Sequence, residues 1–146
     1  PRRSSTAPKD WLLAFGGSFI ILLARPAGHP LWGLNGVAVA LQWAGLVGCV
    51  LALGVLGRSF GVVAADRGLR TGGPYAIVRH PVYASYMITE AGYLLQNPSV
   101  WNLAIVLSGW ACQIGRIVAE ERLLSEDPAW TAFARRTRYR LLPGVF

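Results

Sequence analysis

Two long stretches without a charged side chain limit the folds open to this chain more than any other feature. Residues 26–57 and residues 91–115 contain no Asp, Glu, Lys or Arg. Each stretch exceeds the roughly 20 residues that a helix needs to cross a bilayer. Only 14% of all residues are charged, against about 25% in soluble domains. The sequence therefore predicts an all-α, polytopic membrane protein.

The apolar runs predict about four transmembrane helices, at 11–24, 33–56, 82–95 and from 100 to 115. The first is short, about 21 Å long, and spans only if Lys9 and Arg25 snorkel at its ends. The last two form a C-terminal helical hairpin around a turn at 96–99, and the fourth helix continues into a polar extension. We expect one domain over 1–146, with a two-helix part at 1–57.

The second predicted helix carries small residues four positions apart. They are Gly36, Ala40, Ala44, Gly48 and Ala52. A stripe of small side chains lets a neighbouring helix approach closely in lipid. We interpret this stripe as a packing surface and assign it no chemistry.

The basic residues predict the orientation of the chain in the membrane. There are 13 Arg and 1 Lys, and all except Arg25 lie near the N-terminus, in 58–81 or after 115. The positive-inside rule places these parts, and with them both termini, on the cytoplasmic side. If the protein is bacterial, we expect it to lie in the inner membrane. Because the arginines lie beside apolar runs, we interpret the net charge of +7 as topology and attraction to membrane lipids, and we expect no nucleic-acid partner.

A basic, amphipathic tail at 130–140 follows the fourth helix. Its aromatic residues, Trp130, Phe133 and Tyr139, are the kind that anchor a helix in the membrane interface. We therefore expect the tail to lie at the membrane surface.

Two clusters of polar residues lie at the predicted cytoplasmic ends of the hairpin, at 73–83 and 116–124. In the second cluster, the adjacent carboxylates Glu120 and Glu121 follow Arg116 by one helical turn. One arginine cannot neutralise both carboxylates, and negative charge is unfavourable near a helix C-terminus. A cationic ligand would relieve this imbalance, and an Arg116–Glu120 pair at i,i+4 is the structural alternative.

No metal site is expected. The chain has one histidine besides His80, and this residue, His29, lies on the opposite side of the predicted membrane. Cys49 and Cys112 lie within apolar runs, where small core residues are common. Hydrogen bonding by His80 and Arg79 near the start of the third helix remains the chemistry that we expect.

These clusters resemble the isoprenylcysteine carboxyl methyltransferase and phospholipid methyltransferase superfamily of integral membrane enzymes. The resemblance extends over 56–143 and rests on four elements: Gly73-Pro74-Tyr75, Arg79-His80-Pro81 with Tyr83, Glu120-Glu121 with Leu124, and Arg140-Leu141-Leu142-Pro143. The chain departs from the pattern at Ser85, where a glycine is common, and at Trp130 and Phe133, where tyrosines are usual.

The resemblance implies an S-adenosylmethionine-dependent methyltransferase whose cofactor-binding, catalytic part is 58–146. Its cofactor pocket faces the cytoplasm. The residues that it implies for cofactor binding are Tyr75, Val78, Arg79, His80, Tyr83, Glu120 and Glu121. We expect His80 and Arg116 to act in the catalytic step.

The methyl acceptor is expected to be lipophilic and to enter from the bilayer. Arg116 favours an anionic acceptor such as an isoprenylcysteine-type carboxylate. Glu90, a lone carboxylate within the third helix, would favour an amine instead, unless it pairs with Gln42 or Gln113. Phospholipid amine methylation, small-thiol methylation and a scaffold without enzyme activity are the alternatives. The sequence leaves the oligomeric state open.

Overall fold

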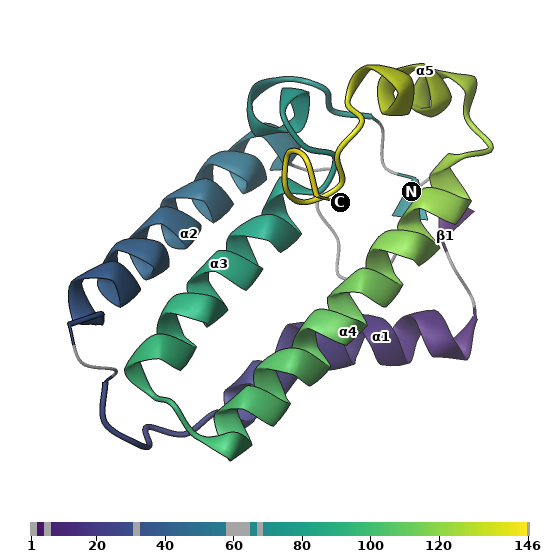
Figure 1. Cartoon of the computed structure of the whole chain (residues 1–146). Coiled ribbons are helices and arrows are strands. Elements are labelled where there is room, and N and C mark those ends of the chain that lie inside the picture. Colours follow the sequence, from purple (N-terminus) through teal and green to yellow (C-terminus); the bar gives the residue numbers. More distant parts are fainter. Residues whose placement is uncertain (1–2, 5–6, 31–32, 58–64, 67–68, 146) are drawn as a thin grey trace.

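The computed structural model describes residues 3–4, 7–30, 33–57, 65–66 and 69–145 and is built almost entirely of helices (Figure 1). The α-helices are α1 (Pro8–Phe19), α2 (Asn35–Leu56), α3 (Pro81–Gln96), α4 (Val100–Leu124) and α5 (Pro128–Arg136). Two 3₁₀ turns, η1 (Ile20–Leu23) and η3 (Gly73–Ala76), and a ladder of two-residue strands, β1 (Arg3–Ser4) with β2 (Ala65–Asp66), complete these elements. The predicted all-α class is confirmed apart from this small ladder. Residues 58–64 and 67–68 of the predicted polar segment lie outside the described residues.

Local signals explain where the last helices begin. Ser99 caps α4 because its hydroxyl accepts a hydrogen bond from the Asn102 backbone N–H at 3.1 Å, which satisfies one of the free donors of the first turn. Asp127 caps α5 in the same way. Proline stands at the start of both α3 and α5, where its missing N–H costs no hydrogen bond.

The long helices pack as two antiparallel pairs, α2 with α3 and α1 with α4 (Figure 1). Glycines let the first pair approach closely. A Cβ added to Gly45 would lie 2.8 Å from the Thr89 backbone nitrogen, and one added to Gly92 would lie 2.6 Å from the Ala38 carbonyl oxygen. The predicted hairpin of the third and fourth helices exists in the chain order, but each of its helices packs mainly on an N-terminal helix.

The predicted stripe of small residues on α2 is only partly correct. The buried residues of α2 are Ala38, Gly45 and Ala52, which lie two turns apart. Gly36, Ala40 and Ala44 are exposed. A spacing of four overshoots one helical turn by about 40°, so a stripe of that spacing winds around the helix instead of staying against α3.

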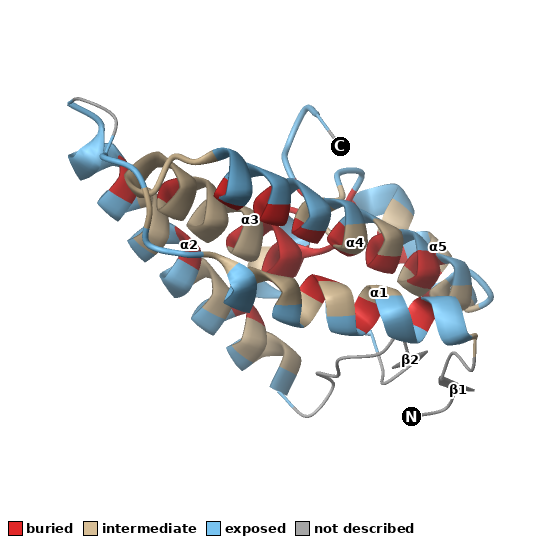
Figure 2. Ribbon diagram, turned by 90° about the horizontal axis from the view of Figure 1, so that it is seen from below, coloured by how far each residue is buried: buried red, intermediate tan, exposed pale blue. Residues whose placement is uncertain are grey.

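Two of the described helices, α2 and α4, are long and apolar enough to cross a membrane. Figure 2 shows that α2 exposes much of its surface, whereas buried positions gather along α3 and α4. The exposed residues of α2 include large apolar ones such as Trp43, Val50 and Leu51, as expected of a surface that faces lipid. Four membrane crossings and their sidedness stay predictions.

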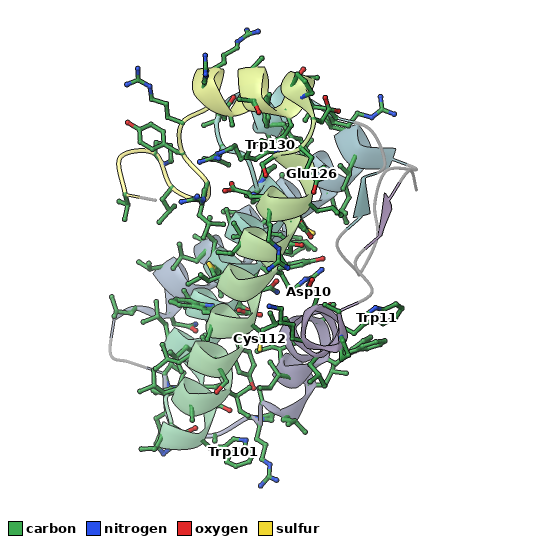
Figure 3. The ribbon with its side chains drawn as sticks, turned by 90° about the vertical axis from the view of Figure 1, so that its right-hand side faces the viewer. Asp10, Trp11, Trp101, Cys112, Glu126 and Trp130 are labelled. Atoms are coloured by element: carbon green, nitrogen blue, oxygen red, sulfur yellow. The ribbon has the colours of Figure 1, made fainter. Side chains whose placement is uncertain are left out.

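The shorter α1, continued by η1, reaches both ends of α4. At one end the Arg122 guanidinium forms an ion pair with Asp10 at 3.2 Å. At the other end the Trp101 indole N–H donates to the Leu23 carbonyl at 2.8 Å. Trp101 lies at the opposite end of α4 from Trp130 and Glu126 (Figure 3). The first apolar run therefore extends as far along the bundle as the helix that it packs against.

The contact between α1 and α4 can be tested by cross-linking, because α4 supplies a native thiol at Cys112, beside α1 (Figure 3). A Cβ added to Gly16 would lie 3.1 Å from Cys112 Sγ and 4.0 Å from Cys112 Cβ. Disulfides have Cβ atoms roughly 3.5–4.5 Å apart. We expect Gly16→Cys to form a disulfide with Cys112 on mild oxidation, measured as the loss of two hydrogens and a linked peptide in mass spectrometry.

Two variants control this experiment. Gly54→Cys places a thiol on α2 where nothing lies within 4 Å of the added Cβ, so it should stay reduced. Gly16→Cys combined with Cys112→Ser should also give no linked peptide. A Gly16→Cys protein that remains fully reduced would contradict the packing of α1 on α4.

Candidate functional site

The two polar clusters predicted to meet do so at one end of the bundle, where α3 begins and α4 ends. The chain after α5 runs beside the residues before α3. The Arg79 backbone N–H donates to the Tyr139 carbonyl and the His80 N–H donates to the Arg140 carbonyl, both at 2.9 Å. These bonds fix the tail against the Arg79-His80 turn, so that residues from three distant parts of the sequence share one site.

Glu121 lies at the centre of this site and is buried. Its Oε1 lies 3.0 Å from Arg79 Nη1 and 3.2 Å from His80 Nε2, and its Oε2 lies 2.8 Å from Arg140 Nε. Two guanidinium groups therefore share one carboxylate. Charge-assisted bonds of this kind are the stronger hydrogen bonds of proteins, and here they join α4, the turn before α3 and the tail.

Glu120 has different surroundings from its neighbour. The Tyr83 hydroxyl donates to Glu120 Oε1, and His80 Nδ1 lies 3.7 Å from Glu120 Oε2. Among the described residues, no arginine or lysine lies within ion-pair distance of Glu120. His80, which also stacks on the Tyr83 ring at 5.8 Å, thus stands between one carboxylate that is neutralised by arginines and one that is not.

Arg79 is held on several sides. Besides Glu121, its Nη2 donates to the Arg138 carbonyl at 3.0 Å, and its guanidinium lies over the Trp130 ring at 5.8 Å. Burial lowers the pKa of Arg79 from its ordinary value, and the charge of Glu121 opposes that shift. Its Nε is buried and has no hydrogen-bond partner among the described residues. A buried donor without a partner is costly, which makes this atom a candidate for binding an anionic group.

Tyr75 and Val78 are buried next to this network. Tyr75 packs in a cluster with Ala52, Val82, Trp130 and Phe133. Burial and, next, the charge of Glu120 raise the pKa of Tyr75 to about 12, so its phenol stays neutral. Both residues lie where the sequence predicts a cofactor wall, and their contact with a cofactor stays a prediction.

The expectation that Trp130 and Phe133 anchor the tail in the membrane interface is wrong. They are only 9% and 7% exposed and belong to the cluster around Tyr75. The amphipathic α5 turns its apolar face onto the protein instead, because Tyr75 and Val82 offer apolar surface at the same end of the bundle. Tyr139 is 40% exposed.

Arg116 lies one turn before the glutamates and is only 6% exposed. Its Nη1 donates to Ser18 Oγ at 3.2 Å and to Gln113 Oε1 at 3.3 Å. Its guanidinium lies over the Tyr83 ring, 4.9 Å from the centroid. The structural alternative, an i,i+4 pair of Arg116 with Glu120, is not formed, because the Arg116 side chain reaches toward α1 and Tyr83. Through Tyr83 it nevertheless adjoins the Glu120 carboxylate.

Glu90 lies further along α3, away from the glutamate pair. The Trp110 indole N–H donates to its Oε2 at 2.8 Å. The expected partners were wrong, since Gln42 bonds to Gln96 and Gln113 bonds to Gly17 and Arg116. A polar neighbour does pair with Glu90, but it is the indole on α4. Its role toward an acceptor stays a prediction.

Sequence reasoning missed two residues of the site. Arg140 bonds directly to Glu121, and Trp130 supports Arg79 from the side of α5. The position of Arg140 in the closing Arg-x-x-Pro element was a usable signal, whereas nothing in the sequence placed Trp130 under a particular arginine. No group of three or more His, Cys, Asp or Glu side chains that could hold a metal occurs in the described part of the chain.

A family of known proteins matches this chain. The family model described as phospholipid methyltransferase matches residues 34–127, which is more than half of the chain and includes η3, α3 and α4. The nickel-cobalt-cadmium resistance protein NccN of Alcaligenes xylosoxydans xylosoxydans is 28% identical over 124 residues. The match covers 81% of this chain and 57% of that relative, so the chain spans little more than half of the relative's length. Helix α1 and the tail after 127 lie outside the family match.

Proposed function

Because the chain belongs to the phospholipid methyltransferase family, we propose that it transfers a methyl group from S-adenosylmethionine to a lipophilic acceptor at the polar end of its helical bundle. The observation that carries this proposal is the asymmetry of the glutamate pair. Glu121 is neutralised by Arg79 and Arg140, while Glu120 faces no arginine or lysine among the described residues.

The residues present fit such a methyl donor. S-adenosylmethionine carries a sulfonium and an ammonium, and Glu120 offers a carboxylate to either cation. The donor also carries a carboxylate, and the buried Arg79 Nε is an N–H donor without a partner among the described residues. When bound, the cofactor supplies the electrophilic methyl group, and the protein supplies position and exclusion of water.

The other residues of the site hold Arg79 and Glu120 in position. Glu121, which also bonds to Arg140, holds the Arg79 guanidinium in place, and the Trp130 ring covers one of its faces. His80 separates the two carboxylates and hydrogen-bonds with Glu121. Tyr83 donates its hydroxyl to Glu120 and so fixes the direction of that carboxylate. Orienting two reactants in this way can supply a large part of a rate enhancement.

The charge of the site favours an anionic acceptor. The described residues bring the guanidinium groups of Arg79, Arg116 and Arg140 together at this end of the bundle. A cationic methyl donor adds to the positive side, so an acceptor carboxylate would meet a favourable field. A carboxylate also needs no general base, because it carries its reactive electron pair already. We propose an isoprenylcysteine-type carboxylate as the acceptor, with Arg116 as the residue that steers it.

An amine acceptor, such as a phospholipid head group, is the second candidate. Glu90 favours it, because this residue places an acidic side chain between α3 and α4, where Trp110 holds one of its oxygens. The candidates differ in the sign of the acceptor's charge, so an acceptor screen separates them.

The proposal is tested with purified protein in detergent and S-adenosylmethionine labelled in its methyl group. A prenylated cysteine with a free carboxylate, a phosphatidylethanolamine and a small thiol are offered as acceptors in separate reactions. We expect label in the prenylcysteine ester, which base hydrolysis releases as methanol. Label in the phospholipid would support the amine candidate, and no label in any acceptor, together with no cofactor binding, would refute the proposed activity.

Cofactor binding is tested separately by calorimetry. We expect Glu120→Gln to weaken S-adenosylmethionine binding by roughly ten- to a hundredfold, because a hydrogen bond to a charged group contributes about 1.5–3 kcal/mol. Glu126→Gln, which removes an exposed carboxylate after the end of α4, is the matched control and should bind normally. Equal affinity in Glu120→Gln and wild type would show that this carboxylate does not hold the donor.

A further inference from the structure

We propose that α1, which lies outside the family match, supplies positioning residues for this site, with Ser18 holding Arg116 and Gly17 holding Gln113. This inference rests on the proposed function, because its kinetic consequence concerns the methyl acceptor. Two polar side chains of α4, Gln113 and Arg116, are buried, and both form hydrogen bonds to α1.

A hydrogen bond to α1 holds the Gln113 side chain in place. It is 1% exposed, and its side-chain N–H donates to the Gly17 carbonyl at 2.7 Å. This bond leaves the Gln113 carbonyl Oε1 directed at Arg116, from which it accepts a hydrogen bond at 3.3 Å. A Cβ added to Gly17 would lie 3.3 Å from both Gln113 Oε1 and Arg116 Cδ. The missing side chain at Gly17 is therefore what allows α1 to lie against both residues.

Ser18 provides the second hold on Arg116. Its hydroxyl oxygen accepts from the same Nη1 atom at 3.2 Å. Ser18 and Gln113 are both uncharged, so they set the position of the guanidinium without cancelling its charge. A charged side chain inside a membrane bundle is expensive and usually has a function. An arginine held only to stabilise the α1–α4 contact would be an inefficient choice, because an apolar side chain could fill the same space.

The contacts continue from Arg116 into the site. Its guanidinium covers the Tyr83 ring, and the Tyr83 hydroxyl donates to Glu120. A cation is attracted to the face of an aromatic ring, so Arg116 helps to hold the Tyr83 ring in position. Ser18 on α1 is thus connected to Glu120 through two intervening side chains. Because Arg116 is the residue proposed to steer the acceptor, we infer that moving its guanidinium weakens acceptor binding. Donor binding stays intact, because the Tyr83 hydroxyl still donates to Glu120.

The kinetic test compares Ser18→Ala with the conservative variant Ser18→Thr. At saturating S-adenosylmethionine, we expect Ser18→Ala to raise the KM for the acceptor roughly tenfold or more, as loss of a hydrogen bond to a charged group predicts. Its kcat and its affinity for the methyl donor should match wild type, and Ser18→Thr should restore the KM. Thr89→Val is the control, since it removes a hydroxyl that donates to the carbonyl of Ser85 on its own helix.

A second readout does not depend on activity. In protein labelled with ¹⁵N-arginine, the side-chain Nε–H resonance of Arg116 can be assigned by its loss in Arg116→Lys. We expect this resonance to shift and to exchange faster with water in Ser18→Ala, and to stay unchanged in Thr89→Val. If the wild type transfers no methyl group, the proposed function fails and this measurement alone decides the position of Arg116.

An unchanged acceptor KM in an active Ser18→Ala protein would overturn the inference, even if its melting temperature fell. An unchanged Arg116 resonance in Ser18→Ala would overturn it as well.

Discussion

His80→Ala should lower the rate of methyl transfer by at least about a hundredfold, the loss that a misplacement of roughly 1 Å can cause. The imidazole lies between the two glutamates, 3.2 Å from Glu121 Oε1 and 3.7 Å from Glu120 Oε2. Without it, the carboxylates lose the group that separates them, and Glu120 loses a neighbour that acts beside Tyr83. The rate is measured with labelled S-adenosylmethionine at saturating donor and acceptor.

The other histidine of the chain gives a matched control. His29 is exposed in the connection between η1 and α2, away from the polar cluster, so His29→Ala should retain full activity. Both variants should elute from a sizing column like wild type, which separates a lost function from a lost fold. Wild-type turnover in His80→Ala would show that the imidazole has no part in the reaction.

Glu121→Ala should be the most destabilising single change at the site. It leaves Arg79, Arg140 and His80 without the carboxylate that all three contact. Removing one partner of a buried ion pair costs roughly 3–5 kcal/mol. We expect about 3 kcal/mol, at the low end of that range, because Arg140 is partly exposed and can bind water. The measurement is the free energy of unfolding in detergent with the cofactor absent.

The control for this prediction is Glu126→Ala, which removes an exposed carboxylate and should change the free energy of unfolding little. If the two variants unfold alike, the Glu121 network does not stabilise the fold. Such a result would leave the cofactor measurement on Glu120 unaffected, because Arg79 and Arg140 pair with Glu121, whereas Tyr83 bonds to Glu120.

The sequence predicted the helices and their common polar end well, because those features depend on local signals. Ser99 caps α4 and Pro81 starts α3, and both are readable in the sequence. The two polar clusters had to meet because antiparallel helices joined by a short turn bring their outer ends to the same side. The family resemblance predicted the same group of residues, and the family match confirms the family itself.

The partners of individual side chains were less predictable. Glu121 and Glu120 are adjacent, yet one is held by arginines 19 and 42 positions away and the other by a tyrosine. Sequence spacing cannot tell which of two neighbouring carboxylates points toward a returning tail. Glu90 shows the same limit, since an indole was not counted among its candidate partners and Trp110 proved to be the donor.

The tail of the site also has a consequence for the order of events during synthesis. Arg140 follows Glu121 by 19 residues, so at roughly 5–20 residues per second it is made about 1–4 seconds later. During that interval Arg79 and His80 already exist, but the tail that binds their backbone does not. The last step in forming the site is therefore the arrival of a short segment that is not itself a membrane helix. A chain cut short between α4 and Arg140 would contain every long helix and lack the segment that closes the polar end of the bundle.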